Sequence, residues 1–484
     1  MGDRQTPLNP SSNSCARWRN NLERCDLSLH SKFALLVFVF VFSFIPSASS
    51  QRPPNIIFIQ ADDLGYGDLS CYGQTRFNTP NLDRMAKEGV RFTQYYAGTT
   101  VCAPSRCSLM TGFHTGHCWI RGNGDYPLRP EDVTVAEVLK GAGYRTAVIG
   151  KWGLGTADST GRPDKQGFDE SFGFLDHTHA HRQYTDHLWK NGEVVKVDPY
   201  KDYVNDLFVD SSIDFIKRGS QPYFLYLALT VPHAELRAPQ DSLDEFAGKF
   251  EETPYVNARA DEILSTKPSA SRQPTVGYRS QAKPRAAFAA MVTRMDKSLG
   301  KLLEAADNNT IIFFASDNGP HAEGGGDPVF FNSSGGLRGM KRDLYEGGIR
   351  VPMIVRWPGR VKAGSTSSQI WAHWDFLATA SDLAAVKNVP RTDGISFVPA
   401  ILGKKQKGHE WLYWEFYERQ GARAMRMGDW KAVAVPYSGE IELYNLKLDP
   451  KEQNNLAASN PQIVARMRQL MDAAHTPSTL FKLP

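Results

Sequence analysis

Five short and almost uninterrupted apolar runs limit what this chain can fold into more than any other feature of its sequence. Each run is rich in β-branched or aromatic residues, a pattern that is typical of a strand buried on both faces. The runs occupy residues 55–60 (NIIFIQ), 145–150 (RTAVIG), 223–231 (YFLYLALTV), 310–315 (TIIFFA) and 351–356 (VPMIVR). Because helical stretches separate most of them, we expect an α/β fold: a large mixed, mostly parallel sheet sandwiched by helices.

Amphipathic or capped stretches between the runs predict the helices. Thr79 is expected to cap a helix over 80–89 that ends at Gly89. The longest helix is expected over 285–306, where apolar residues recur on one side. Further helices are predicted over 134–141, 208–217 and 371–386.

The pattern changes after about residue 403. Short, closely spaced strands predict a small antiparallel sheet, and a helix over 462–474 follows them. We therefore expect a leader over 1–50, a large α/β domain over 51–403 and a C-terminal α+β subdomain over 404–484. The predicted strands of the subdomain are 411–416, 422–427, 430–435 and 440–445.

The leader has the organisation of a secretory signal peptide. Residues 33–45 (FALLVFVFVFSFI) are apolar, Lys32 precedes them, and small residues follow before Gln51. The run is shorter than the roughly 20 residues that span a bilayer, so we expect removal of the leader, with an uncleaved anchor as the alternative. The mature protein is expected to be exported to the periplasm, the cell exterior or a lumen, with no stable membrane partner.

The net charge argues against a nucleic-acid-binding protein, and the cysteine content argues against a small fold held together by disulfides. The net charge is only +4 over 484 residues, which gives no electrostatic reason to expect a nucleic-acid partner. Outside the leader the chain has too few cysteines for a disulfide framework. These cysteines are Cys71, Cys102, Cys107 and Cys118.

Polar residues collect just beyond the carboxyl ends of predicted strands, where open parallel sheets place their binding sites. Adjacent carboxylates repel each other and are costly to bury without a cation. Carboxylate and amide oxygens suit Ca²⁺ or Mg²⁺ and do not obviously suit Zn²⁺. The clusters therefore indicate a metal site, although each pair alone is also common in turns and helix caps. They comprise Asp62 and Asp63 after the first strand, Lys151 after the second, and Asp317 and Asn318 after the fourth.

Residues 102–112 read CAPSRCSLMTG and match the pattern C-x-P-S-R-x-x-L-x-T-G at every specified position. On this motif the chain resembles the type I sulfatases of the alkaline phosphatase superfamily, and the resemblance covers about residues 55–456. Pro104 suggests that the motif begins a helix, whose amino end would face a bound anion. The resemblance includes DDLGYGD at 62–68, the segment 143–155, SDNG at 316–319, YEGGIRVP at 345–352 and LYNL at 443–446.

This resemblance implies an alkaline phosphatase-like enzyme that hydrolyses a sulfate ester, with residues 51–403 as its catalytic domain. In the family the signature cysteine is converted to formylglycine by a formylglycine-generating enzyme, so Cys102 would be the precursor of a hydrated aldehyde. One hydroxyl of that group would attack sulfur with the help of Ca²⁺ (Mg²⁺ being less suitable), and the other would expel sulfate. The implied substrate is a sulfated small molecule or carbohydrate.

The functional residues of the family carry over onto matching positions of this chain. Arg106 would hold the modified Cys102 and the metal carboxylates in place, and Lys151 would contact the sulfate. Either His233 or Lys341 would protonate the leaving oxygen. The oxygen on the modified Cys102 would complete a metal site formed by Asp62, Asp63, Asp317 and Asn318.

The chain departs from the family pattern at Gly153. Many relatives read G-K-W-H-L-G where this chain reads GKWGLG at 150–155, so the histidine that would touch the formylglycine hydroxyl is absent. Another group must take that proton, or the second step is slower. His321, which follows the expected metal ligands, is one candidate. Other histidines in this part of the sequence are His114, His117, His177, His179 and His181. The last three lie in a run (176–181) that fits a substrate-contacting or solvated loop better than a zinc site.

Two alternative functions stay open. The superfamily also includes phosphodiester and phosphonate hydrolases. Comparing the hydrolysis rates of nitrophenyl sulfate and nitrophenyl phosphate diesters would distinguish such an enzyme from a sulfatase. A chain in which Cys102 stays unmodified would be a non-catalytic binder of sulfated glycans. Export favours an extracellular sulfated carbohydrate as the substrate.

Overall fold

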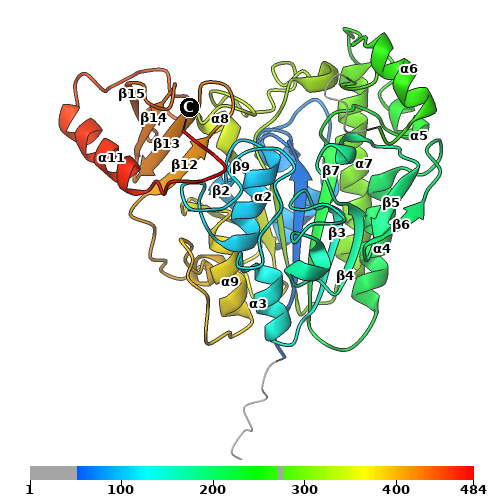
Figure 1. Ribbon diagram of the computed structural model, residues 1–484, viewed down its shortest axis with the longest axis horizontal. Helices are drawn as coiled ribbons and strands as arrows, with labels where there is room; N and C mark the ends of the chain where they lie inside the picture. Colours follow the sequence, from blue (N-terminus) through cyan, green and yellow to red (C-terminus); the bar gives the residue numbers. More distant parts are fainter. Residues whose placement is uncertain (1–51, 271–275, 484) are drawn as a thin grey trace, which may run out of the picture. The chain divides into compact units, whose positions relative to one another are not determined.

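The predicted apolar runs form the centre of one large sheet in the computed structural model (Figure 1). The structure describes residues 52–270 and 276–483, so the predicted leader lies outside the described residues. The strand order is β10-β2-β9-β8-β1-β7-β3-β4-β5-β6, and β11 pairs with β2. The strands are β1 (Asn55–Asp62), β2 (Val90–Tyr96), β3 (Arg145–Lys151), β4 (Glu170–Phe174), β5 (His187–Lys190), β6 (Glu193–Lys196), β7 (Tyr223–Pro232), β8 (Thr310–Ser316), β9 (Arg350–Arg356), β10 (Ser365–Ser367) and β11 (Trp371–Ala372).

The neighbouring strands β8, β1, β7 and β3 run parallel, which brings their carboxyl ends to one edge of the sheet. The register places Phe58 of β1 between Tyr226 of β7 and Phe313 of β8. Strand β9 pairs antiparallel with both β8 and β2, and β5 pairs antiparallel with β4 and β6. The prediction of a mixed, mostly parallel sheet is confirmed.

Helices cover both faces of this sheet, because alternate residues of each central strand point to opposite sides. Ile57 and Ile59 pack with α1, α4 and α7, whereas Ile56 and Phe58 pack with α2, α3 and α9. The helices are α1 (Pro80–Glu88), α2 (Cys102–Thr111), α3 (Val135–Gly141), α4 (Val204–Lys217), α5 (Gln240–Asp244), α6 (Ala258–Thr266), α7 (Pro284–Ala305), α8 (Glu346–Ile349), α9 (Asp375–Leu383), α10 (Val398–Ile401) and α11 (Pro461–Ala473).

A second, antiparallel sheet follows α10, as the change of pattern after residue 403 predicts. Its order is β12-β13-β14-β15, and α11 packs against it through Met467 and Met471. Residues from Arg52 onward form one compact unit, and the division at residue 403 stays a prediction. The strands are β12 (Leu412–Phe416), β13 (Ala422–Met427), β14 (Trp430–Ala434) and β15 (Ile441–Asn445).

Two local predictions were wrong. The helix expected over 371–386 begins only at Asp375, because Trp371 and Ala372 pair with Tyr95 and Tyr96 of β2 instead. The side chain of Thr79 does not cap α1. Backbone N–H groups of the first turn of α1 instead donate to the carboxylate of Asp296 on α7, so a long-range contact supplies the cap.

Strand β2 and the strands β4, β5 and β6, which lie toward one edge of the sheet, were not predicted. Each is short or only partly buried, and its residues mix polar and apolar types without a clear period. Within the described ranges, no helix has the length and apolar character needed to cross a membrane.

Candidate active site

Four chain segments deliver polar side chains to the carboxyl edge of the sheet. Asp62 is the last residue of β1, Lys151 the last of β3, and His233 follows β7 directly. Asp317 follows β8, and its backbone N–H donates to Ala61 O at 3.1 Å. All of these side chains are at most 1% exposed, so the charges meet in a site shielded from bulk water.

The signature motif forms α2, as predicted, and Cys102 is its first residue. Arg106 lies one turn further along, so both side chains project from the same face of the helix. Ser105 fixes this end of the helix, because its Oγ donates to Asp317 O at 2.5 Å. The positive end of the helix dipole therefore lies where Cys102 meets the strand ends.

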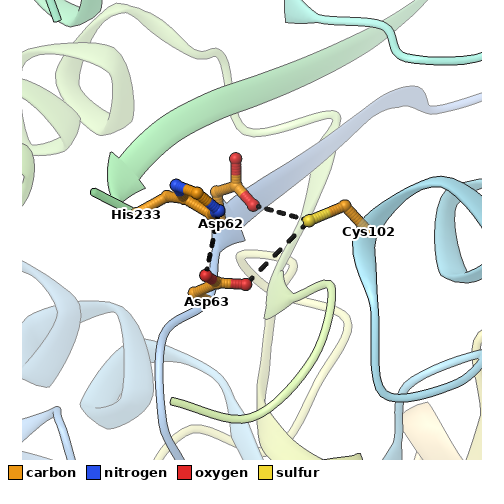
Figure 2. A group of neighbouring side chains, drawn as sticks. All are labelled: Asp62, Asp63, Cys102 and His233. Atoms are coloured by element: carbon orange, nitrogen blue, oxygen red, sulfur yellow. Dashed lines mark hydrogen bonds and ion pairs between the residues drawn. The ribbon is translucent and has the colours of Figure 1, made fainter. Parts of the chain in front are cut away.

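Cys102 faces the two adjacent aspartates (Figure 2). Its Sγ lies 3.4 Å from Asp62 Oδ1 and 4.0 Å from Asp63 Oδ1. Burial raises the pKa of the Cys102 thiol well above its ordinary value, despite the nearby Lys151. The encoded thiol is therefore protonated at neutral pH and is a poor nucleophile as it stands.

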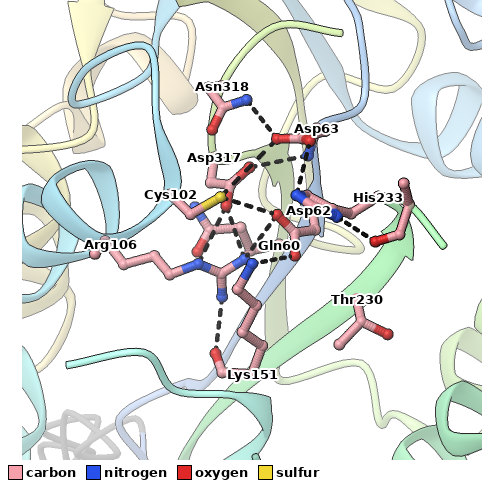
Figure 3. Close-up of polar contacts among 12 residues, drawn as sticks. Gln60, Asp62, Asp63, Cys102, Arg106, Lys151, Thr230, His233, Asp317 and Asn318 are labelled. Carbon is pink, nitrogen blue, oxygen red and sulfur yellow. Dashed lines mark hydrogen bonds and ion pairs between the residues drawn. The ribbon is translucent and has the colours of Figure 1, made fainter. Parts of the chain in front are cut away.

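Cations neutralise the buried carboxylates pairwise (Figure 3). Lys151 Nζ lies 2.6 Å from Asp62 Oδ2, and Lys341 Nζ lies 2.8 Å from Asp63 Oδ2. Arg106 Nη2 lies 2.8 Å from Asp317 Oδ2. Burial alone would lower the pKa of Lys151, but its acidic neighbours, Asp62 foremost and Asp317 with it, together outweigh burial and raise that pKa. The pairing leaves the buried cluster with no net charge.

The fourth predicted metal ligand has an unused acceptor. Asn318 Nδ2 donates to Asp63 Oδ1 at 2.6 Å, while Asn318 Oδ1 is buried with no hydrogen-bond partner among the described residues. A buried amide oxygen without a partner is costly. Together with the carboxylates of Asp62, Asp63 and Asp317 it forms an all-oxygen donor set, which fits a hard divalent cation.

His233 and Lys341 lie together on the far side of Asp63. Lys341 Nζ is 2.8 Å from His233 Nε2, and His233 Nδ1 donates to Ala234 O at 2.5 Å. Burial and the charge of Lys341 lower the pKa of His233 well below its ordinary value, so the ring is neutral. Its Nε2 then accepts a hydrogen bond from the Lys341 ammonium.

Glu323 closes this side of the site and was not predicted. Its Oε2 lies 3.7 Å from His233 Nε2 and 3.8 Å from Lys341 Nζ, and it accepts a 2.5 Å hydrogen bond from Tyr278. Although burial opposes ionisation, Lys341 and other cations hold the pKa of Glu323 at about 2. Glu323 and Tyr278 belong to no motif and do not directly follow a strand end, so the sequence offered no signal for them.

A second group of residues that was not predicted, Tyr226, Gln60 and His373, forms a hydrogen-bonded chain that leads to Arg106. Arg106 Nη1 donates to Lys151 O at 2.8 Å and to Tyr226 Oη at 3.4 Å. Tyr226 donates in turn to Gln60, whose amide lies 3.0 Å from His373 Nε2. Gln60 does have a sequence signal, since it is a polar residue at the end of an otherwise apolar strand.

The close packing of two motif loops requires glycine. A Cβ on Gly319, which follows Asn318, would lie 2.0 Å from Gly347 O. Gly319 N also donates to Gly348 O at 3.0 Å. The SDNG and YEGGIR motifs therefore form one unit, which holds Asp317 and Asn318 at the edge of the sheet.

All residues predicted to be metal-binding or catalytic lie together in this site, and their roles stay predictions. His321 does not provide the free base that was considered for Gly153. Its Nε2 lies 3.2 Å from Pro232 O, and its Nδ1 accepts from Glu323 N at 3.0 Å. Both ring nitrogens are thus occupied by the backbone, so His321 is a structural residue.

Two family models match this chain. The model described as Sulfatase matches residues 54–386. The model described as N-sulphoglucosamine sulphohydrolase, C-terminal, matches residues 339–476. Together they span both sheets of the structure.

Curated relatives match over most of their length. The chain is 31% identical to human arylsulfatase A over 88% of this chain and 89% of that protein. It is 28% identical to an N-acetylgalactosamine-6-O-sulfatase of Bacteroides thetaiotaomicron over 89% of this chain and 94% of that protein.

Solved structures give the same fold. The structure of Ps i-CgsB in complex with k-i-k-neocarrahexaose matches with a TM-score of 0.72 and 27% identity, over 90% of this chain and 94% of that one. A structure in complex with its substrate D-glucosamine-2-N,6-O-disulfate matches with a TM-score of 0.70 and 25% identity, over 87% and 97%. A phosphonate monoester hydrolase of Agrobacterium radiobacter, at 21% identity, shares the fold alone.

The signature helix, the strand-end cluster and the extent of the Sulfatase match lead to one assignment. The chain belongs to the sulfatase family and is a sulfuric ester hydrolase.

Proposed function

We propose that this sulfatase removes sulfate from an extracellular sulfated carbohydrate, using a formylglycine formed from Cys102 and a bound Ca²⁺. The observation that carries the proposal is the position of Cys102, whose Sγ lies 3.4 Å from Asp62 Oδ1 at the positive end of α2. A nucleophile formed at that atom would stand between the proposed cation ligands and the buried lysines.

The surroundings of residue 102 suit a hydrated aldehyde. Hydrated formylglycine supplies one hydroxyl for attack on sulfur and a second whose deprotonation releases sulfate, which a serine or cysteine would not provide. Asp62 and Asp63 offer acceptors for such hydroxyls, since both carboxylates already lie nearest the thiol. Arg106 would hold this arrangement through Asp317.

Asp62, Asp63, Asp317 and Asn318 would hold the cation, with residue 102 as a further ligand. The all-oxygen donor set and the unpartnered Asn318 Oδ1 support Ca²⁺ over softer metals. A cation bound there lowers the pKa of a coordinated hydroxyl and neutralises charge on the sulfate.

The charges of the site fit a sulfate ester and an ionised nucleophile that are present together with a divalent cation. The buried carboxylates of Asp62, Asp63 and Asp317 are balanced by Lys151, Lys341 and Arg106. A sulfate ester carries one negative charge, and a deprotonated hydroxyl on residue 102 would carry a second, so the two together with a divalent cation would preserve this balance, whereas the cation alone would leave a buried net charge.

Lys341 is the proton donor that we propose for the leaving oxygen, since its ammonium donates to a neutral His233. Lys341→Ala should lower turnover of a sugar sulfate by about 10²-fold or more. Nitrophenyl sulfate, whose leaving group needs little protonation, should lose much less. Steady-state rates on both substrates test this, with Lys151→Ala as the matched control that should slow both equally. An equal loss on both substrates in Lys341→Ala would assign it to sulfate binding alone.

Sulfated carbohydrate is proposed as the substrate because of what the relatives act on or bind. The N-acetylgalactosamine-6-O-sulfatase and the two carbohydrate complexes match over most of their chains. Export through the predicted leader would place the protein in the periplasm, outside the cell or in a lumen, where such polymers occur. Activity should be higher on carbohydrate sulfates than on nitrophenyl phosphate diesters.

Peptide mass spectrometry of the active protein tests the proposed nucleophile. The peptide with residue 102 should have lost the thiol mass and gained that of an aldehyde or its hydrate. It should also react with a hydrazide probe. An unmodified thiol in fully active protein would disprove the formylglycine mechanism. The peptide that contains Cys71 is the internal control, since that thiol should stay unmodified.

A further inference from the structure

Imidazole rings line up beside the sulfate site. The ring centroids of His177 and His181 are 6.2 Å apart, and His181 stacks on His233 at 4.3 Å. His233 in turn stacks on His321 at 5.4 Å. His233 and His321 are hydrogen-bonded, whereas no hydrogen bond is made by the rings of His177 and His181 within residues 52–270 and 276–483. Two imidazoles of the row thus keep free ring nitrogens.

His177 lies against the position where the chain departs from its family. Backbone hydrogen bonds join Trp152 N to Phe174 O and Gly153 N to Leu175 O, both at 2.9 Å. These hydrogen bonds hold the segment that follows β4 against Gly153. A Cβ on Gly153 would lie 3.5 Å from the Cβ of His177 and 3.9 Å from Cδ of Arg106. His177 and Arg106 thus both border the space that a side chain at position 153 would enter.

Gly153 itself is suited to this packing. Its φ is +74°, a left-handed conformation that is costly for a residue with a side chain. A small cavity beside it is lined by Tyr126, Gly153, Asp176 and His177. A side chain at position 153 would therefore strain the backbone, and His177 borders the small cavity next to this position.

Burial and the nearby cations keep the His177 ring neutral. Burial, and then the ammonium of Lys151, lower its pKa to about 4. Lys341 and Arg106 act in the same direction, and Asp176 acts against them. A neutral imidazole with a free ring nitrogen, within the electrostatic influence of Lys151 and Arg106, can act as a proton acceptor.

We propose that His177 is the general base on the side of residue 102 and takes over the role for which Gly153 has no side chain. The inference rests on the proposed function. In the second step the O–H bond of the free hydroxyl on the sulfated residue 102 would break and an N–H bond would form on the His177 ring. The electron pair left on that oxygen would form the aldehyde C=O while the C–O bond to sulfate breaks, sulfate would leave, and the imidazolium would return the proton to solvent. His181, which stacks on His233, belongs to the leaving-group side.

Chemical rescue tests this role directly. His177→Ala should lower turnover by about 10²-fold, and added imidazole should restore at least about a tenth of the lost rate. Rescue is expected because truncation to alanine vacates the volume of the imidazole ring next to the small cavity beside Gly153. His187→Ala is the matched control, since His187 is bonded to Asp186 away from the site. It should change turnover by no more than about twofold, with no response to imidazole.

The extent of formylglycine formation is measured in every variant by the mass of the residue 102 peptide, and rates are expressed per aldehyde. Absence of aldehyde from active wild-type protein would overturn the proposed function. A folded, fully converted His177→Ala protein with wild-type turnover, or one that imidazole does not rescue, would overturn the role of His177 alone.

A second readout needs neither turnover nor a variant. Diethyl pyrocarbonate modifies neutral, accessible imidazoles, and inorganic sulfate bound at Lys151 should shield His177 from it. Peptide mapping should therefore show slower carbethoxylation of His177 when sulfate is present, with no change at His187. Equal modification of His177 with and without sulfate would contradict its place beside the bound sulfate.

Discussion

Cys102→Ala protein is expected to fold normally and to lose at least about 10⁴-fold in sulfate ester hydrolysis, since removal of a covalent nucleophile leaves only binding and electrostatic effects. The thiol makes weak contacts with Asp62 and Asp63, and both carboxylates keep their lysine partners when it is removed. The loss should therefore appear in kcat, while the melting temperature changes little. Hydrolysis of nitrophenyl sulfate and thermal unfolding measure the two effects.

Cys107→Ala is the matched control for this experiment. Cys107 lies on the same helix, is fully buried, and packs into the core on the far face from the site. Its truncation should cost stability through a small cavity, by about 1 kcal/mol, and leave hydrolysis per folded molecule unchanged. Cys102→Ser should be as inactive as Cys102→Ala. Substantial multiple turnover by Cys102→Ser would show that the second hydroxyl of the proposed nucleophile is not needed.

The parts of the site that could be predicted are those fixed by local sequence. Asp62 and Lys151 each end a buried parallel strand, and the edge at which such strands end is determined once the apolar runs are recognised. Cys102 and Arg106 are separated by one helical turn, so their common direction also follows from the chain itself. These residues come together because the strands that precede them lie side by side in one sheet. The alternation of apolar strands and helices along the sequence already indicates such a sheet.

The parts that could not be predicted depend on contacts between distant loops. Glu323 reaches Lys341 and His233 only because the loop after β8 folds back over the end of β7. His177 looked like part of a solvated or substrate-contacting run, and its value as a base appears only from its packing against Gly153. The same limit explains the error at Trp371, where pairing with β2 prevails over a local preference for helix.

Removal of the divalent cation should abolish activity reversibly without unfolding the protein. In the described site every buried carboxylate has a cationic partner, so the cation-free protein is not left with unpaired buried charge. Treatment with a chelator should lower hydrolysis by at least about 100-fold, because the coordinated hydroxyl loses its activation and the sulfate its counter-charge. Added Ca²⁺ should restore the rate.

Binding of the cation should also raise the stability of the protein. This effect distinguishes loss of activity through removal of the cation from direct inhibition by the chelator. A ligand at about 100 times its dissociation constant raises the free energy of unfolding by about 2.7 kcal/mol, so Ca²⁺ should raise the melting temperature of chelated protein. In Asn318→Ala, which removes an oxygen that has no other partner, the same rise should need about 10-fold more Ca²⁺ or higher. Asn309→Ala, at an exposed turn before β8, is the control and should bind as the wild type does. Full activity in protein that elemental analysis shows to be free of metal would remove the cation from the reaction and leave Lys151, Lys341 and Arg106 as the sole counter-charges to sulfate.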